Sequence, residues 1–178
     1  MKKLAVMFPG MNYNSDKPLL YYTKKILSKE NYDIVSIAYG ELPKEKQPAF
    51  DIAIKKAEEV TKDINWSNYD TILFVSKSIG TILAGIIAAN LPKNIKHIYL
   101  TPVNETLEFM KGDIVVFSGK EDPMINTKDL VAECKNKEIE LYLYDDCNHS
   151  METGDVNKDI KILSDITEKC QKHIKNIK

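Results

Sequence analysis

The feature that most constrains the fold of this chain is the stretch at residues 69–91, where two apolar segments follow each other directly. Residues 71–75 (TILFV) predict a buried β-strand, and the apolar run at 79–91 predicts a helix. The two are joined by the pentapeptide SKSIG, which is centred on Ser78. This joint predicts a tight strand-to-helix turn that places Ser78 at the end of a buried strand.

Small residues flank Ser78 two positions before and two positions after it, at Ser76 and Gly80. A turn that lifts the Ser78 hydroxyl clear of the backbone strains φ and ψ and brings strand and helix close together, so only Gly, Ala or Ser fits beside it. The N-terminus of the following helix offers free N–H groups and the positive end of the helix dipole. This arrangement is a nucleophile elbow. An ordinary Ser- and Gly-containing turn is the alternative, because such short patterns recur by chance.

Strand-like and helix-like patterns alternate along the chain, without internal repeats or a low-complexity linker. Strands are expected at 4–8, 32–39, 71–75, 97–100, 113–118 and 140–144, and helices at 18–27, 48–64, 79–91, 127–135 and 156–174. Such alternation predicts one α/β domain over residues 1–178, doubly wound, with a mainly parallel sheet of about six strands and helices on both faces. The mixed polarity of the last strand favours a position at the sheet edge.

Charge and composition exclude several classes of partner. The chain of 178 residues is 43% hydrophobic and carries a net charge of −1, so we expect no nucleic-acid partner. All 25 basic residues are lysines. Because bidentate recognition of phosphate usually depends on arginine, a phosphorylated substrate is disfavoured.

The three cysteines are too few and too scattered for a disulfide framework or a zinc site, so we expect no bound metal. The apolar run before Pro9 is too short for a signal peptide, and no apolar stretch approaches the roughly 20 residues of a membrane span. We therefore expect a cytoplasmic protein with reduced thiols and no membrane partner.

Two further residues join Ser78 at the edge of the sheet where ligands bind in open α/β folds. Asp122 follows the expected strand at 113–118, and His149 follows the expected strand at 140–144. Because the carboxyl ends of parallel strands share one edge, these three side chains are expected to lie near one another. The chain order Ser, Asp, His is that of α/β-hydrolases and differs from the order in chymotrypsin-like and subtilisin-like proteases.

On these residues, the sequence resembles the small lid-less serine hydrolases of the α/β-hydrolase family. The resemblance covers nearly the whole chain, which begins at what corresponds to the third strand of that fold and so lacks the first two. It implies that Ser78 is the nucleophile, His149 the general base and Asp122 the acid that orients the imidazole. The backbone N–H groups of Met11 and Ile79 would form the oxyanion hole, and no cofactor would be needed.

The expected substrate-binding residues are Gly10, Tyr13, Met124 and Met151. Gly10 lets the loop after the first strand turn close to the elbow. The other three are candidates to line an acyl pocket, although methionines fill protein cores just as often.

The identity of the acid has competitors in sequence. Asp122 precedes a proline and also suits an ordinary turn. Asp145 and Asp146 lie close to His149 along the chain and remain substitutes for it.

Four other reactive side chains receive structural interpretations. Lys77 is interpreted as an exposed residue, with the steering of anionic substrates as a weaker alternative. Cys147 lies two residues from His149, but a reactive role for it is disfavoured. His97 begins a strand and His173 lies in the last helix, so both are expected to be structural.

Together these features predict a serine hydrolase that acts on a small-molecule acyl ester or thioester. With only residues 101–112 where larger relatives carry a lid, we expect an open, shallow site that favours short acyl groups. A non-catalytic interaction domain on the same fold is the alternative. A flavodoxin-like nucleotide-binding module is disfavoured because no Gly-rich loop follows the first strand. The sequence leaves the oligomeric state undetermined.

Overall fold

The computed structural model describes residues 1–177. Its sheet has the order β2-β1-β3-β4-β5-β6, and every neighbouring pair of strands is parallel. This confirms the predicted doubly wound parallel sheet. The strands are β1 (Lys3–Phe8), β2 (Tyr32–Ser36), β3 (Thr71–Lys77), β4 (Lys96–Leu100), β5 (Ile114–Gly119) and β6 (Glu140–Tyr144).

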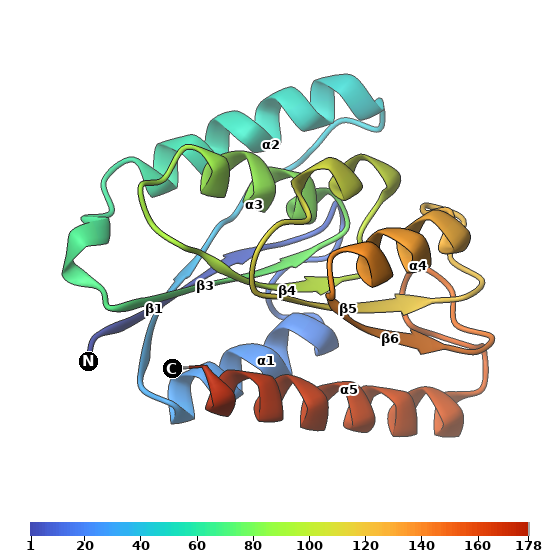
Figure 1. The fold of residues 1–178 in the computed structure, drawn as a ribbon. Helices are drawn as coiled ribbons and strands as arrows, with labels where there is room; N and C mark the ends of the chain where they lie inside the picture. Colours follow the sequence, from blue (N-terminus) through green and yellow to red (C-terminus); the bar gives the residue numbers. More distant parts are fainter. Residues whose placement is uncertain (178) are drawn as a thin grey trace.

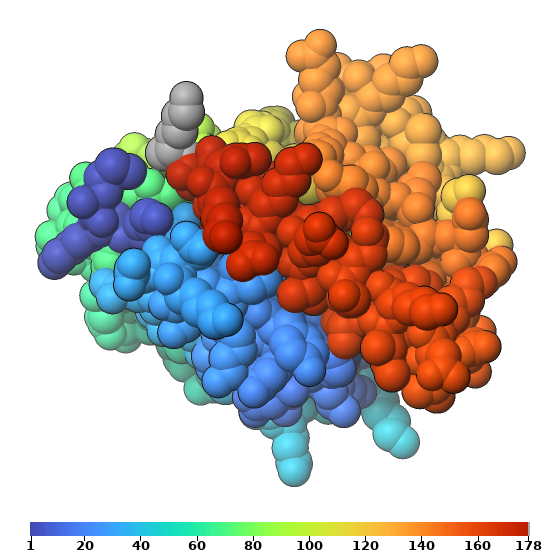
Figure 2. All heavy atoms as spheres, turned by 90° about the horizontal axis from the view of Figure 1, so that it is seen from below, coloured from blue at the N-terminus to red at the C-terminus, as the bar shows by residue number. Residues whose placement is uncertain are grey.

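Helices cover both faces of the sheet, as Figure 1 shows. Helices α1 and α5 lie on one face, and Figure 2 shows them packed against each other across it. Helices α2, α3 and α4 lie on the opposite face. The helices are α1 (Pro18–Lys29), α2 (Lys46–Thr61), α3 (Ile79–Ala89), α4 (Thr127–Asn136) and α5 (Val156–Asn176), with short 3₁₀ segments at Trp66–Asn68 (η1) and Asn104–Phe109 (η2).

Strand β3 is buried along its whole length because it lies inside the sheet and is covered on both faces. Successive side chains of a strand point to opposite faces. Leu73 and Val75 accordingly join the core shared with α1 and α5, whereas Phe74 packs with Leu83 of α3 on the other side. The all-apolar strand pattern in the sequence reflects this two-sided burial.

Helix α2 begins at Lys46 and ends at Thr61, whereas a helix over 48–64 was predicted. Two strands differ from the expectation by two residues or more, for tertiary reasons. Strand β2 ends at Ser36 rather than at residue 39, and Tyr39 is instead buried in the following loop, where its hydroxyl donates to Pro9 O (3.2 Å). Strand β3 continues two residues beyond 75 because it pairs with β4 as far as Lys77 and Leu100. None of the helices formed by residues 1–177 is both long enough and apolar enough to cross a bilayer.

Candidate active site

Ser78 occupies a strained turn between β3 and α3. Its backbone angles are φ 55° and ψ −126°, a conformation that a residue with a side chain rarely adopts. The Ser78 N–H donates to the carbonyls of Leu100 and Thr101, both at 3.2 Å, which fixes the turn to the end of β4. A Cβ added at Gly80 would lie 2.2 Å from Phe8 O, so only glycine fits there. The steric argument made for the elbow therefore applies in full.

The structure brings Ser78, His149 and Asp122 into one hydrogen-bonded series. Ser78 Oγ lies 2.8 Å from His149 Nε2, and His149 Nδ1 lies 2.8 Å from Asp122 Oδ2 and 3.0 Å from Oδ1. The Asp122 side chain is fully buried, whereas the imidazole is 25% exposed. A hydroxyl, an imidazole and a buried carboxylate in this order can move a proton off the hydroxyl.

The loops after β5 and β6 hold Asp122 and His149 by packing against each other. Asp122 Oδ1 accepts a hydrogen bond from Met124 N (2.9 Å), and Glu121 N donates to Cys147 O (3.0 Å) in the other loop. A Cβ at Gly119 would lie 2.1 Å from Cys147 O, so glycine allows this close approach. These contacts orient the carboxylate before any substrate is present.

The two competing carboxylates point elsewhere. Asp145 pairs with Lys120 (2.5 Å) and Asp146 with Lys158 (2.6 Å), and both acids are largely exposed. The hydrogen bond from Lys120 lowers the pKa of Asp145. Neither acid is among the hydrogen-bond partners of His149 within residues 1–177. The structure thus places only one of the three candidate acids against the imidazole.

Lys77 is buried, so its interpretation as an exposed residue is wrong. Only 2% of its surface is accessible, and its ammonium donates to Thr101 Oγ1 (2.8 Å) and to the carbonyl of His149 (2.9 Å). It also lies 4.6 Å from the centre of the Tyr13 ring. Burial lowers the pKa of Lys77 to about 8, although the negative charge of Asp122 acts in the opposite direction. Through its hydrogen bond to the His149 carbonyl, Lys77 connects strand β3 to the loop that carries the imidazole.

Met11 and Ile79, the two residues expected to supply the oxyanion hole, come from different elements, the loop after β1 and the start of α3. Both residues line the same cavity as Ser78, and neither N–H donates a hydrogen bond to another group within residues 1–177. Gly10 pairs with Tyr13 in a tight turn, which brings the loop so close that a Cβ at Gly10 would lie 3.2 Å from Ser78 Cβ. Two backbone donors of residues that line this cavity are thus without a protein acceptor within residues 1–177.

A groove of about 370 Å³ opens beside Ser78. Its floor is one face of α3, and its walls come from the start of α2, from η2 and from the loops after β1 and β5. The sequence does not predict the walls from α2 and η2, although the spacing of three isoleucines along α3 indicates an apolar stripe. The lining residues are Met11, Lys46, Gln47, Phe50, Ser78, Ile79, Ile82, Ile86, Val103, Glu105, Glu108, Phe109 and Met124.

Tyr13 and Met151, which were expected beside Met124, lie outside this groove. They line a separate cavity of about 570 Å³ between the loop before α1 and the N-terminal part of α5. The Tyr13 hydroxyl accepts a hydrogen bond from Leu19 N (3.0 Å), which turns it toward α1. Among the four expected substrate-binding residues, Met124 lines the groove and Gly10 packs beside Ser78.

His97 and the three cysteines are buried, and His173 is partly buried. Burial lowers the pKa of His97 to about 3 and also lowers that of His173. Cys147 is fully buried, and burial raises the pKa of its thiol. Within residues 1–177, no three His, Cys, Asp or Glu side chains are grouped so that they could hold a metal ion.

Solved structures resemble this chain, whereas no protein-family model and no curated protein sequence matches it. A lid-less α/β serine hydrolase from Xanthomonas campestris is 15% identical, with a TM-score of 0.67 over 97% of this chain and 81% of that one. An esterase from Pyrococcus furiosus is 14% identical, with a TM-score of 0.70 over 99% and 83%. A candidate hydrolase of the α/β superfamily from Xanthomonas campestris pv. campestris is 13% identical, with a TM-score of 0.66 over 97% and 99%. Taken with the parallel sheet and the strained elbow, these likenesses show that the chain has the α/β-hydrolase fold.

Proposed function

We propose that the protein is a serine hydrolase that cleaves small acyl esters or thioesters through an acyl-enzyme intermediate. The observation that carries this proposal is the continuous hydrogen-bonded series from Ser78 through His149 to Asp122. It lies at the carboxyl edge of a parallel sheet, where ligands bind in this class of fold.

In the first half of the reaction, Ser78 Oγ attacks the acyl carbon while His149 Nε2 takes the hydroxyl proton. The carbonyl oxygen becomes an oxyanion, which the free N–H groups of Met11 and Ile79 stabilise. The carbon–oxygen or carbon–sulfur bond to the leaving group then breaks, and His149 returns the proton to the departing alcohol or thiol. The acyl group remains on Ser78.

In the second half, a water molecule replaces the leaving group. His149 takes a proton from this water, whose oxygen attacks the acyl carbon, and then returns the proton to Ser78 Oγ as the carboxylic acid departs. Asp122 accepts the Nδ1–H of His149 throughout, which fixes the tautomer and stabilises the imidazolium. Complete burial of the carboxylate strengthens this interaction.

A fluorophosphonate probe tests the proposal directly. An activated serine attacks phosphorus as it attacks an acyl carbon, so the probe should become covalently attached to Ser78. Intact-mass measurement should show one adduct on the wild-type protein and none on a folded Ser78→Ala variant. Absence of labelling in the wild type, or labelling that persists in the variant, would refute the proposal and favour the interaction-domain alternative.

A further inference from the structure

The groove beside Ser78 runs along the length of α3. Ile79, Ile82 and Ile86 line it at a spacing that places them on one face of the helix, and each is only partly buried. From Ser78 to Gly85, the residue before Ile86, the helix advances by about 10.5 Å, at roughly 1.5 Å per residue. An acyl group on Ser78 therefore meets an apolar floor that leads away from the reacting carbon.

Phe109, at the end of η2, stands across the far end of this floor. It lines the groove, and together with Glu108 it also lines a second cavity of about 190 Å³. A Cβ at Gly85 would lie 2.4 Å from Phe109 Cβ and 2.5 Å from Cγ, so the side chain rests directly on the backbone of α3. Only a glycine at position 85 allows this contact, which makes Phe109 a wall between the two spaces.

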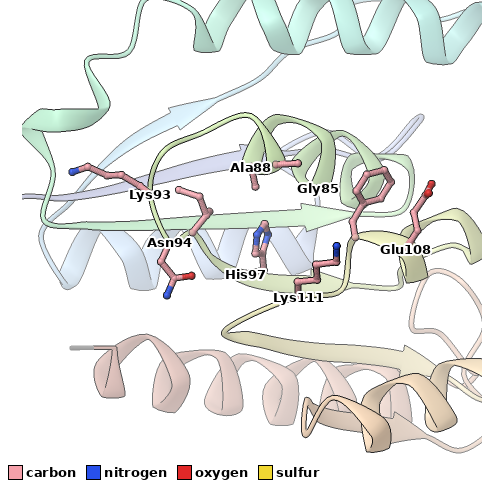
Figure 3. A pocket seen from close by; sticks show the side chains of 10 residues that line it. Gly85, Ala88, Lys93, Asn94, His97, Glu108 and Lys111 are labelled. Atoms are coloured by element: carbon pink, nitrogen blue, oxygen red, sulfur yellow. The ribbon is translucent and has the colours of Figure 1, made fainter.

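The second cavity, here called the rear cavity, continues the line of α3 for one more turn. Small residues of α3 leave the space open, and Figure 3 shows Gly85 and Ala88 above His97. The ammonium of Lys93 donates a hydrogen bond to Tyr69 O (2.6 Å). Only the aliphatic part of this side chain is therefore expected to face the rear cavity. The lining residues are Gly85, Ala88, Ala89, Lys93, Asn94, Ile95, His97, Glu108, Phe109 and Lys111.

We propose that Phe109 determines substrate specificity by limiting the acyl group in the groove to about eight carbons. This inference rests on the proposed hydrolase function. The limit follows from length, because an extended hydrocarbon chain with bonds of about 1.5 Å advances by roughly 1.3 Å per carbon. The floor from Ser78 to the Phe109 wall thus accommodates medium-length chains, which are longer than the short acyl groups suggested by the missing lid.

The test is a chain-length profile of kcat/KM on p-nitrophenyl esters from acetyl to hexadecanoyl. For the wild type, kcat/KM should rise to an optimum near octanoyl and fall for longer chains. The Phe109→Ala variant opens the rear cavity, and one further helical turn of about 5.4 Å corresponds to about four carbons. Its optimum should therefore move to about dodecanoyl, and Phe109→Leu should give an intermediate optimum.

Two further variants separate the rear cavity from a general loosening of the groove. Phe50→Ala removes the same side chain from the opposite wall, on α2, without joining the two cavities. It should change rates at all lengths while keeping the optimum near octanoyl. Adding Ala88→Phe to Phe109→Ala refills the rear cavity and should return the optimum toward octanoyl.

The possible failures are distinguishable. If fluorophosphonate labels Ser78 but the optimum of Phe109→Ala equals that of the wild type, or Phe50→Ala moves it equally, then Phe109 does not set the chain length and the hydrolase proposal stands. If Ser78 is not labelled in the wild type, both proposals fall. A melting curve for each variant checks that it is folded, and Phe109→Leu carries the test if Phe109→Ala does not fold.

Discussion

At the carboxyl end of the sheet, buried polar side chains are joined by hydrogen bonds, and the backbone is strained. Lys77 and Asp122 are both almost fully buried, and each is hydrogen-bonded. Ser78 and Thr101, at the ends of adjacent strands, both have positive φ, at 55° and 44°. Each such residue costs about 1–3 kcal/mol of folding free energy, so the surrounding contacts must hold it in place.

The amino end of the sheet also has residues of positive φ, Asn31 (60°) after α1 and Glu138 (55°) after α4, but it differs in its charged and polar groups. Its charged groups lie nearer the surface, as in the pair of Lys96 with Asp113, whose Nζ and Oδ2 atoms are 2.5 Å apart. The buried His97 makes no side-chain hydrogen bond through Nδ1 within residues 1–177, and it packs between the rings of Phe74 and Tyr99. Its lowered pKa means that it is neutral, so its burial carries no charge cost.

The comparison of the two ends of the sheet shows that the buried charges of this protein lie at its carboxyl end. Burying a charge or straining a backbone is tolerated only where many contacts enforce it, and around Ser78 the two occur together. We therefore expect substitutions at the carboxyl end of the sheet to have large effects on catalytic activity and on how the stability of the protein depends on pH. At the amino end, substitutions should have small effects.

The largest expected effect is that of Asp122→Asn. An amide cannot stabilise the imidazolium of His149 and favours the wrong tautomer, so kcat should fall by about 10⁴, as the equivalent change does in another serine hydrolase. Asp145→Asn and Asp146→Asn are matched controls and should each lower kcat by less than about tenfold, as expected of surface substitutions. Near-normal kcat in Asp122→Asn together with collapse in either control would show that the acid is misassigned.

Gly80→Ala tests the close packing of β1 against α3. On helix propensity alone, alanine would stabilise this position by up to about 1 kcal/mol. The added Cβ, 2.2 Å from Phe8 O, should instead destabilise the protein by about 3 kcal/mol. Urea unfolding measures the free energy, and a variant as stable as the wild type would mean that the elbow tolerates a wider gap.

Lys77→Met tests the buried ammonium through the pH dependence of stability. The pKa is about 8 in the folded protein, against about 10.4 in an unfolded chain. Between these values the unfolded chain holds a proton that the folded protein has lost, so Lys77 should add about 3 kcal/mol of stability as pH rises through this window. Burial raises the pKa of the Cys134 and Cys170 thiols, which acts in the opposite direction but equally in both proteins. The stability of the wild type relative to the variant should therefore increase with pH, and a pH-independent difference would show that Lys77 does not titrate in this range.

The same variant should also lower activity. Without the ammonium, the carbonyl of His149 and the hydroxyl of Thr101 lose their common donor, and the loop that carries the imidazole is held less firmly. We expect kcat to fall by about tenfold to a hundredfold with KM little changed, since small displacements of reacting groups have effects of this size. Unchanged kcat would show that the loop contacts after β5 suffice to position His149.

The smallest effect is expected from Lys96→Gln at the amino end. Partly exposed ion pairs contribute up to about 1 kcal/mol, so the free energy of unfolding should change by less than that. The kcat/KM for octanoyl ester should equal that of the wild type. A larger loss in either measurement would remove the contrast between the two ends of the sheet.

The order of strands and helices, the turn at Ser78 and the sequence of Ser, Asp and His were predictable from the chain alone. Each depends on local rules: the two-residue period of strands, the wider period of helices, and the steric need for a small residue at Gly80. The sequence left Asp122 in competition with Asp145 and Asp146. The structure places Asp122 against His149 because the loops after β5 and β6 pack against each other.

The burial of Lys77, the separation of Tyr13 and Met151 from Met124, and the wall formed by Phe109 were decided only by tertiary structure. Lys77 lies inside because its strand is paired on both sides and covered on both faces. Phe109 packs directly on α3 because a glycine more than 20 residues earlier, in that helix, leaves room for its side chain. Such contacts join residues far apart in the chain, and no local period in the sequence encodes which distant surfaces meet.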